Sequence, residues 1–173
     1  MTALVELIKT KAVLRGQFML RSGKISRFYL DKYRLATQPQ ILGPVTEALS
    51  ELIPTGVQLL AGPELGAVAL VAALSLKVQK PFLIIRKSVK DYGTNKRIEG
   101  TFESGQSVLL VEDVLTTGGA VLSAAQACKE AGLNVVGIVA ILNRGKGAEE
   151  NIAQAGFKFL GALYTEADLG MVE

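Results

Sequence analysis

Short apolar runs that favour β-strands alternate along this chain with segments whose apolar residues recur at helical spacing. The strand-like runs lie at 57–61, 82–85, 108–111, 135–142 and 157–160. Helical patterns lie at 38–54, 67–78, 120–131 and 148–155. Runs such as VLLV and VVGIVAIL are apolar on consecutive residues, which is typical of central strands covered on both faces. The alternation predicts an α/β fold with a mainly parallel central sheet flanked by helices.

The chain before this alternation has a different character. Residues 1–13 predict a first amphipathic helix, because Glu6 and Lys9 interrupt the apolar core that a signal peptide would need. Residues 18–35 mix aromatic and charged side chains and predict a hairpin or cap region. We find neither an internal repeat nor a Pro/Gly/Ser linker, so we expect a single domain over residues 1–173.

Composition excludes several classes of protein. A single cysteine and the absence of histidine exclude zinc sites of the Cys/His type and every catalytic triad with a histidine base. Nineteen basic against sixteen acidic residues give a net charge of +3, too small an excess for a dedicated nucleic-acid binder. The longest apolar tract, at 66–76, is shorter than the roughly 18 residues that span a bilayer. We therefore expect a cytoplasmic protein with neither nucleic-acid nor membrane partners, and with Cys128 as a small core residue.

The most informative segment is VLLVEDVLTTGGA, at 108–120. An apolar strand delivers two adjacent carboxylates, Glu112 and Asp113, and a Thr-Thr-Gly-Gly turn then opens a helix. Such a turn directs backbone N–H groups and hydroxyls at an anion at the positive end of the helix, which makes a phosphate cradle. The carboxylates would repel that phosphate, so they are expected to face hydroxyls, as a sugar phosphate would offer. The alternative is an ordinary strand, turn and capped helix with exposed acids.

This stretch resembles the motif by which type I phosphoribosyltransferases bind 5-phosphoribosyl 1-pyrophosphate (PRPP). The resemblance implies the type I phosphoribosyltransferase fold with a small N-terminal hood at about 1–36. It also implies a catalytic role for Asp113. The residues that it assigns to PRPP here are Glu112, Asp113, Val114, Leu115, Thr116, Thr117, Gly118, Gly119 and Ala120.

A basic stretch lies at 86–100, where a long polar segment separates two strand-like runs. A solvated charged loop is one interpretation of it. Its pattern resembles the catalytic loop of orotate phosphoribosyltransferases, with Tyr92 where that family usually has histidine. The resemblance implies that Arg86, Lys87 and Lys90 bind PRPP, with Lys90 and Arg86 catalytic. It also implies a homodimer in which each loop closes over the pyrophosphate in the neighbouring subunit.

Two further segments resemble the PRPP-binding parts of this family. AGPELGAVAL, at 61–70, resembles the pyrophosphate loop, where Gly62 and Gly66 would let backbone amides reach phosphate oxygens. The resemblance implies a strained non-proline peptide bond near Glu64–Leu65, with the cis form as one candidate conformation. The alternative is a plain turn between strand and helix that contains glycines. In the second segment, at 18–32, Arg21 stands where many members have lysine and is assigned to PRPP.

The base site is indicated by the same hood segment and by AILNRGKG, at 140–147. In the family the hood covers the orotate ring, which assigns Tyr29 and Thr116 to orotate, although Tyr29 could equally be a core residue of a hairpin. Arg144 occupies the position of the arginine that binds the orotate carboxylate, a planar anion to which a guanidinium donates two parallel hydrogen bonds. Asn143 and Lys146 replace the acidic residues that commonly flank it, and an exposed loop cation is the alternative role for Arg144.

Together these resemblances imply an orotate phosphoribosyltransferase that converts orotate and PRPP to orotidine 5′-monophosphate and pyrophosphate. They imply Mg²⁺ as cofactor, held mainly by PRPP, with direct ligation by the protein not expected. The alternatives are a type I phosphoribosyltransferase for a purine base, or a PRPP-binding regulator that would need an output module.

Overall fold

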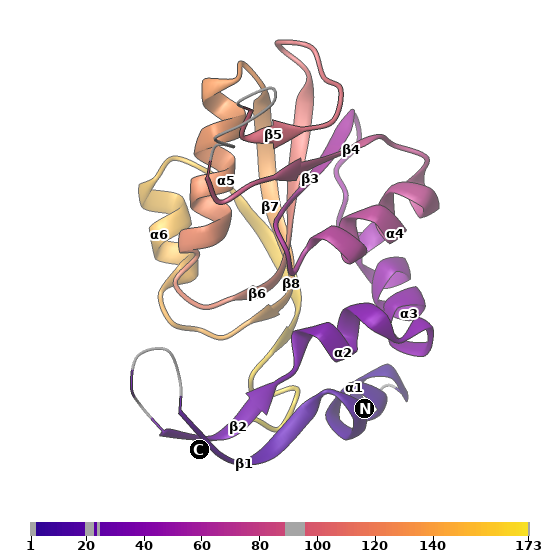
Figure 1. Cartoon of the computed structure of the whole chain (residues 1–173), viewed down its shortest axis with the longest axis vertical. Helices are drawn as coiled ribbons and strands as arrows, with labels where there is room; N and C mark the ends of the chain where they lie inside the picture. The colour runs from indigo at the N-terminus through magenta and orange to yellow at the C-terminus, as the bar shows by residue number, and fades with distance from the viewer. Residues whose placement is uncertain (1–2, 20–22, 24, 89–95, 173) are drawn as a thin grey trace.

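The computed structural model describes residues 3–19, 23, 25–88 and 96–172, and it contains the predicted α/β architecture (Figure 1). Its central six-stranded sheet has the order β5-β4-β3-β6-β7-β8. The strands are β3 (Leu59–Pro63), β4 (Phe82–Ile85), β5 (Ile98–Glu99), β6 (Ser107–Leu115), β7 (Asn134–Asn143) and β8 (Phe159–Thr165). All neighbouring pairs are parallel except β4 and β5.

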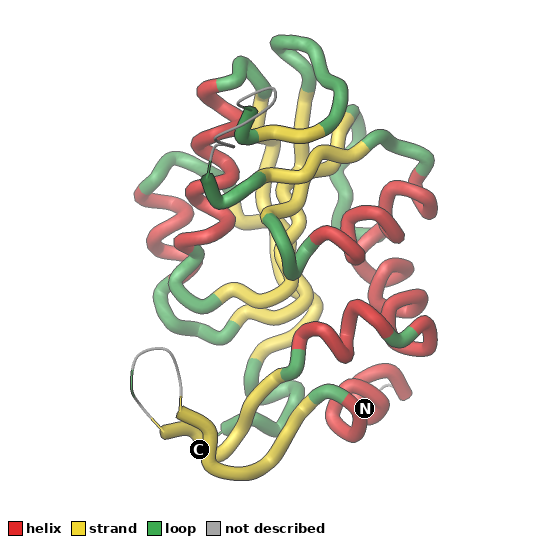
Figure 2. Tube along the Cα trace, in the orientation of Figure 1, coloured by secondary structure: helices red, strands yellow, loops and turns green. Residues whose placement is uncertain are grey.

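Helices cover both faces of this sheet (Figure 2). The sheet faces are covered by α3 (Pro39–Ser50), α4 (Val68–Val78), α5 (Gly119–Glu130) and α6 (Ala148–Gln154), and two further helices, α1 (Ala3–Lys11) and α2 (Lys32–Thr37), lie at one end. Successive strand residues point to opposite faces, so Leu109 packs in the cluster with α3 and α4, while Leu110 packs in the cluster with α5 and α6. Cys128 on α5 is fully buried, which confirms it as a core residue. Among the described residues, no helix has both the length and the apolarity to cross a membrane.

A small unit at the N-terminus packs against one end of the sheet (Figure 1). It consists of α1, the antiparallel hairpin of β1 (Val13–Met19) and β2 (Ile25–Leu30), and α2. Asp31 caps α2, because its side chain accepts hydrogen bonds from the backbone N–H groups of Tyr33 and Arg34. Late in the chain, Leu169 and Met171 are buried in the same core cluster as α1. Both ends of the chain therefore build this hood.

The observed bounds of β6 differ from the predicted ones at its C-terminal end. β4 has the predicted bounds, whereas the apolar run at 108–111 predicted that β6 would end before its two carboxylates. The strand instead continues to Leu115, and Glu112 pairs with Ala140 of β7. Backbone pairing does not depend on side-chain polarity, so the ladder extends past the apolar run and places both acids inside the sheet.

Candidate active site

Charged and polar residues directly follow the parallel strands at one edge of the sheet. Pro63 and Ile85 are paired at the ends of β3 and β4, and Glu64 and Arg86 come next in the chain. Leu115, Asn143 and Thr165 are in register at the ends of β6, β7 and β8. The residues after them are Thr116, Arg144 and Glu166. Ligands of open parallel sheets bind at this edge, so the register brings separate parts of the sequence to one site.

Glu112 and Asp113 lie deep at this edge, where only 5% and 4% of their surface is exposed. The Glu112 carboxylate accepts a hydrogen bond from Asp113 N at 3.0 Å, and Asp113 Oδ1 accepts one from Val114 N at 2.6 Å. Burial, together with the adjacent Asp113 charge, raises the pKa of Glu112 well above its usual value. Apart from the Lys32 ammonium, Asp113 Oδ2 has no hydrogen-bond partner among the described residues, so it retains capacity to accept a further hydrogen bond.

Lys32, the first residue of α2, provides the counter-charge. Its ammonium lies 3.1 Å from Asp113 Oδ2. Burial lowers the pKa of Lys32, but attraction to Asp113, a hydrogen bond to it and the charges of Glu112 and Tyr33 together outweigh burial, and the net shift is upward. Gly66 makes this arrangement possible, since a Cβ there would lie 1.9 Å from Asp113 Oδ2 and 2.6 Å from Lys32 Nζ. The hood, the turn after β3 and the acids of β6 therefore meet at one point.

The turn between β6 and α5 has the geometry expected of an anion cradle. Thr116 and Thr117 are exposed, and Gly118 caps α5 with φ of +81°, a conformation that favours glycine. The first N–H groups of this twelve-residue helix have no partner within the helix and lie at its positive end. Before the turn, Val114 is half-buried and Leu115 is buried, whereas Gly119 and Ala120 in the first turn of α5 are exposed. The exposed part of the motif can receive a phosphate.

Cations gather beside this cradle. A cavity of about 310 Å³ is lined by the first turn of α5 and by Glu64, Arg86, Lys87 and Arg97, among others. Glu64 Oε1 accepts a hydrogen bond from Lys87 N at 2.9 Å, and its Oε2 lies 3.8 Å from Arg86 Nη1. The Glu64–Leu65 peptide is cis, as the resemblance implied. Lys90, Tyr92 and Arg21 lie outside the described residues.

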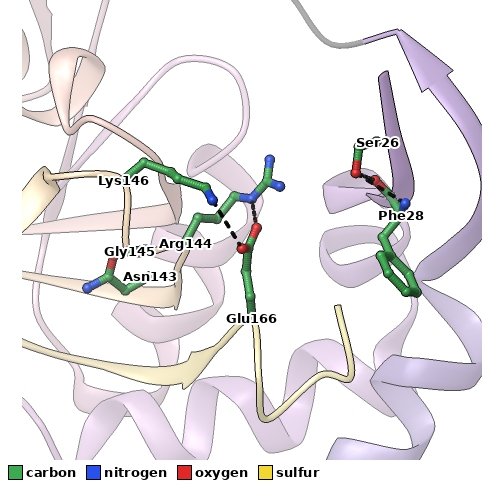
Figure 3. A network of polar contacts seen from close by, with 7 residues as sticks. All are labelled: Ser26, Phe28, Asn143, Arg144, Gly145, Lys146 and Glu166. Carbon is green, nitrogen blue, oxygen red and sulfur yellow. Dashed lines mark hydrogen bonds and ion pairs between the residues drawn. The ribbon is translucent and has the colours of Figure 1, made fainter. Parts of the chain in front are cut away.

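Arg144, which the sequence left open as an exposed loop cation, is largely buried and ion-paired. Its Nε donates a short hydrogen bond to Glu166 Oε1, and Lys146 Nζ lies 3.7 Å from Glu166 Oε2 (Figure 3). Asn143 turns away from this pair, since its amide donates to Glu149 at 2.6 Å. The carboxylate beside Arg144 therefore comes from the end of β8.

The aromatic residues of the hood divide between core and surface. Phe28 packs against the core cluster, as a hairpin core residue would. Tyr29 is instead 46% exposed, and its ring lies 5.5 Å from that of Phe18 between centroids. Tyr29 is therefore free to contact a ligand.

Sequence reasoning missed two residues of this site, Lys32 and Glu166. Lys32 ends the hood segment at 18–32 but was given no role, because its partner Asp113 is far away in the chain. Glu166 gave no signal, because the strand-like run ends at residue 160 and only the observed strand reaches Thr165.

The described residues fit a magnesium ion that is carried by a substrate better than one held by the protein. No group of three or more Cys, Asp or Glu side chains gathers among the residues that the structure describes. Mg²⁺ commonly binds through one or two carboxylates together with substrate phosphates. Asp113, whose Oδ2 contacts the Lys32 ammonium and can accept a further bond, lies next to a cradle for phosphate and matches that second arrangement.

A phosphate cradle that follows two acids on this fold defines the class of phosphoribosyltransferases. Accordingly, the family model for the phosphoribosyl transferase domain matches residues 33–160. The chain is 46% identical over 160 residues to the orotate phosphoribosyltransferase of Pyrococcus horikoshii, covering 90% of this chain and 86% of the relative. It is 42% identical over 170 residues to that of Methanocella arvoryzae, covering 98% and 97%. The chain belongs to the orotate phosphoribosyltransferase family.

Solved structures agree with this assignment. The fold matches that of Mycobacterium tuberculosis orotate phosphoribosyltransferase in complex with Fe(III) dicitrate with a TM-score of 0.84 and 30% identity, over 96% of this chain and 97% of that one. The same enzyme in complex with PRPP matches with a TM-score of 0.80 and 29% identity, over 96% of each chain.

Proposed function

We propose that this chain transfers the 5-phosphoribosyl group of PRPP to orotate, giving orotidine 5′-monophosphate and pyrophosphate in de novo pyrimidine synthesis. One observation carries the choice of base. Arg144 N donates to Leu115 O at 2.9 Å, so the strand end that carries Arg144 lies directly beside the turn that begins at Thr116. A phosphate cradle and a group suited to a planar carboxylate are thereby neighbours. Adenine or hypoxanthine would bring no anion to that guanidinium.

The two carboxylates are assigned to the ribose. Asp113 Oδ2 is buried and, apart from the Lys32 ammonium, has no hydrogen-bond donor among the described residues, so it can accept a further hydrogen bond from a ribose hydroxyl. Glu112, whose pKa is raised by burial and by Asp113, can donate a hydrogen bond when protonated as well as accept one. The 5′-phosphate is assigned to Thr116, Thr117 and Gly118, with Gly119 and Ala120 at the start of α5.

The cations are assigned to pyrophosphate. When the C1–O bond of PRPP breaks, its electron pair leaves on pyrophosphate while positive charge develops on the ribose. Arg86 and Lys87 line the cavity next to α5 and can offset the negative charge, and the sequence assigns the same role to Lys90 and Arg21. When PRPP carries it, Mg²⁺ supplies further neutralisation of that leaving group. A ring nitrogen of orotate, which gives up its proton, bonds to the ribose carbon.

The base itself is assigned to Arg144 for its carboxylate and to Tyr29 and Thr116 for its ring. The hood presents the aromatic side chain of Tyr29 with nearly half of its surface exposed. Such a ring can stack on a planar base and exclude water from it.

The proposal extends to the assembly. We propose one domain over residues 1–173, with the hood at about 1–36 and the catalytic loop at about 86–100, because hood and sheet share one core cluster. We also propose a homodimer with shared sites and a cytoplasmic location; a single buried thiol in the chain is compatible with a reducing compartment.

Steady-state turnover with PRPP and Mg²⁺ and a panel of orotate, uracil, adenine and hypoxanthine tests the function. We expect turnover of orotate alone. Replacing Arg144 with alanine should raise KM for orotate about thirtyfold to several thousandfold, as expected for losing one partner of a buried charge pair. The KM for PRPP should change little. Efficient use of a purine, or equal damage to both KM values in Arg144→Ala, would contradict the assignment of the base.

A further inference from the structure

The Arg144–Glu166 pair joins two neighbouring strand ends. Asn143 and Thr165 are paired in register, and the next residue of each strand end is Arg144 and Glu166 respectively. The side chains of the pair are 20% and 18% exposed. Ion pairs that are screened so little by water hold their geometry more firmly than exposed pairs do. Glu166 is thus placed to fix the orientation of the arginine.

Glu166 contacts the Arg144 guanidinium through Nε. A guanidinium has five N–H donors, and within the described residues the Arg144 side chain donates to Glu166 from Nε. In Figure 3 the two terminal nitrogens point away from Glu166, toward the side of the view where Ser26 and Phe28 of the hood lie. The edge formed by Nη1 and Nη2 is the one that could bind a carboxylate through two parallel bonds.

Lys146 gives the cluster of Arg144, Glu166 and Lys146 its net charge. Arg144 and Glu166 alone would be neutral, and a neutral pair attracts an incoming carboxylate weakly. Lys146 Nζ lies 3.7 Å from the second oxygen of Glu166, on a side chain that is 60% exposed. With Lys146 the three groups carry one net positive charge, which matches one substrate carboxylate.

We propose that Glu166 is a positioning residue for orotate: it holds Arg144 through Nε so that Nη1 and Nη2 bind the orotate carboxylate, while Lys146 keeps the cluster cationic. This inference rests on the proposed function of the chain. It assigns base selection to a carboxylate that directly follows β8, although the ligand to be bound is itself an anion. Net charge alone would make Glu166 unfavourable, so its benefit must come from orientation.

A charge-balanced double variant separates orientation from charge. Lys146→Met combined with Glu166→Gln keeps the net charge of the cluster at +1 but removes the carboxylate that holds Nε. Kinetics with orotate and PRPP varied separately should give a KM for orotate that is raised about tenfold to a hundredfold, which is typical when a binding group is misplaced by about 1 Å. The KM for PRPP and the melting temperature should stay near those of the parent. Glu150→Gln removes a carboxylate from an exposed position on α6 and serves as the matched control.

The outcomes are distinguishable. A double variant whose KM for orotate stays within about threefold of the parent would show that only net charge matters, and would overturn the proposal. Glu166→Gln alone gives a second test: a lower KM for orotate would show that Glu166 competes with the substrate, and would also overturn it. If the unmodified protein fails to use orotate at all, the proposed function fails instead.

Discussion

Replacing Gly66 with alanine tests how closely the Asp113 carboxylate is packed. The new Cβ would lie 1.9 Å from Asp113 Oδ2, whereas ordinary contacts begin at 3.4 Å. The carboxylate would have to move by about 1.5 Å to reach normal van der Waals separation. Lys32 Nζ, the end of a flexible side chain, can yield, but Asp113 is 4% exposed and its other oxygen is held by Val114 N. The added Cβ therefore displaces the Asp113 carboxylate, and that displacement costs free energy.

Two measurements check this reasoning. Displacing a binding group by more than 1 Å should lower kcat/KM for PRPP about a hundredfold. Overpacking of about 1–3 kcal/mol should also lower the melting temperature by roughly 2–4 °C per kcal/mol. Gly43→Ala is the matched control, because a Cβ at that position on α3 meets nothing within 4 Å. Activity near that of the parent in a folded Gly66→Ala variant would refute the idea that the position of Asp113 limits turnover.

Three further predictions concern single groups. Burial raises the pKa of the Cys128 thiol to about 12, so a thiol reagent at pH 8 should label the native protein far more slowly than the unfolded chain; equal rates would contradict its burial. The folded-state pKa of Glu112 is raised, so its contribution to stability is present below the unfolded pKa, near 4.5, and is lost as the pH rises through the folded value. Glu112→Gln should therefore become more stable relative to the parent as the pH rises. Denaturant unfolding at several pH values measures this difference. If active sites are shared between subunits, mixing inactive Lys90→Ala and Asp113→Asn subunits should restore activity, whereas no rescue after verified exchange would show that each loop serves its own subunit.

The parts of the site that could be predicted from sequence are those carried by one continuous segment. Glu112 and Asp113 lie on β6 and the turn from Thr116 follows it directly, so their order along the chain is also their order in space. Lys32 could not be predicted in this way, because its contact with Asp113 joins α2 to β6 and leaves no periodic pattern. The contact of Glu166 with Arg144 has the same character, and only the register of β7 and β8 reveals it.

The strand boundaries that were missed have a related cause. The apolar run that predicted β8 ends at Leu160, but the strand continues through Gly161 to Thr165, because the last strand of a sheet can be half-exposed and less apolar. β5 lies within the stretch interpreted as a polar loop, since two residues are too few to leave a pattern. The central strands, which are buried on both faces, were predicted because their composition is constrained on both sides.

The burial of Leu169 and Met171 beside α1 has a consequence for the order in which the chain can fold during synthesis. Helix α1 is made first, but the residues that cover it are made after every strand of the central sheet. The strands that carry the cradle can therefore assemble early, whereas the hood must wait for a contact that closes a loop of almost the whole chain. A nascent chain that has not yet reached Glu166 would already contain the whole phosphate cradle, but Arg144 would still lack its partner. In the order of synthesis, the proposed phosphate cradle is complete before the Arg144–Glu166 pair proposed for the base.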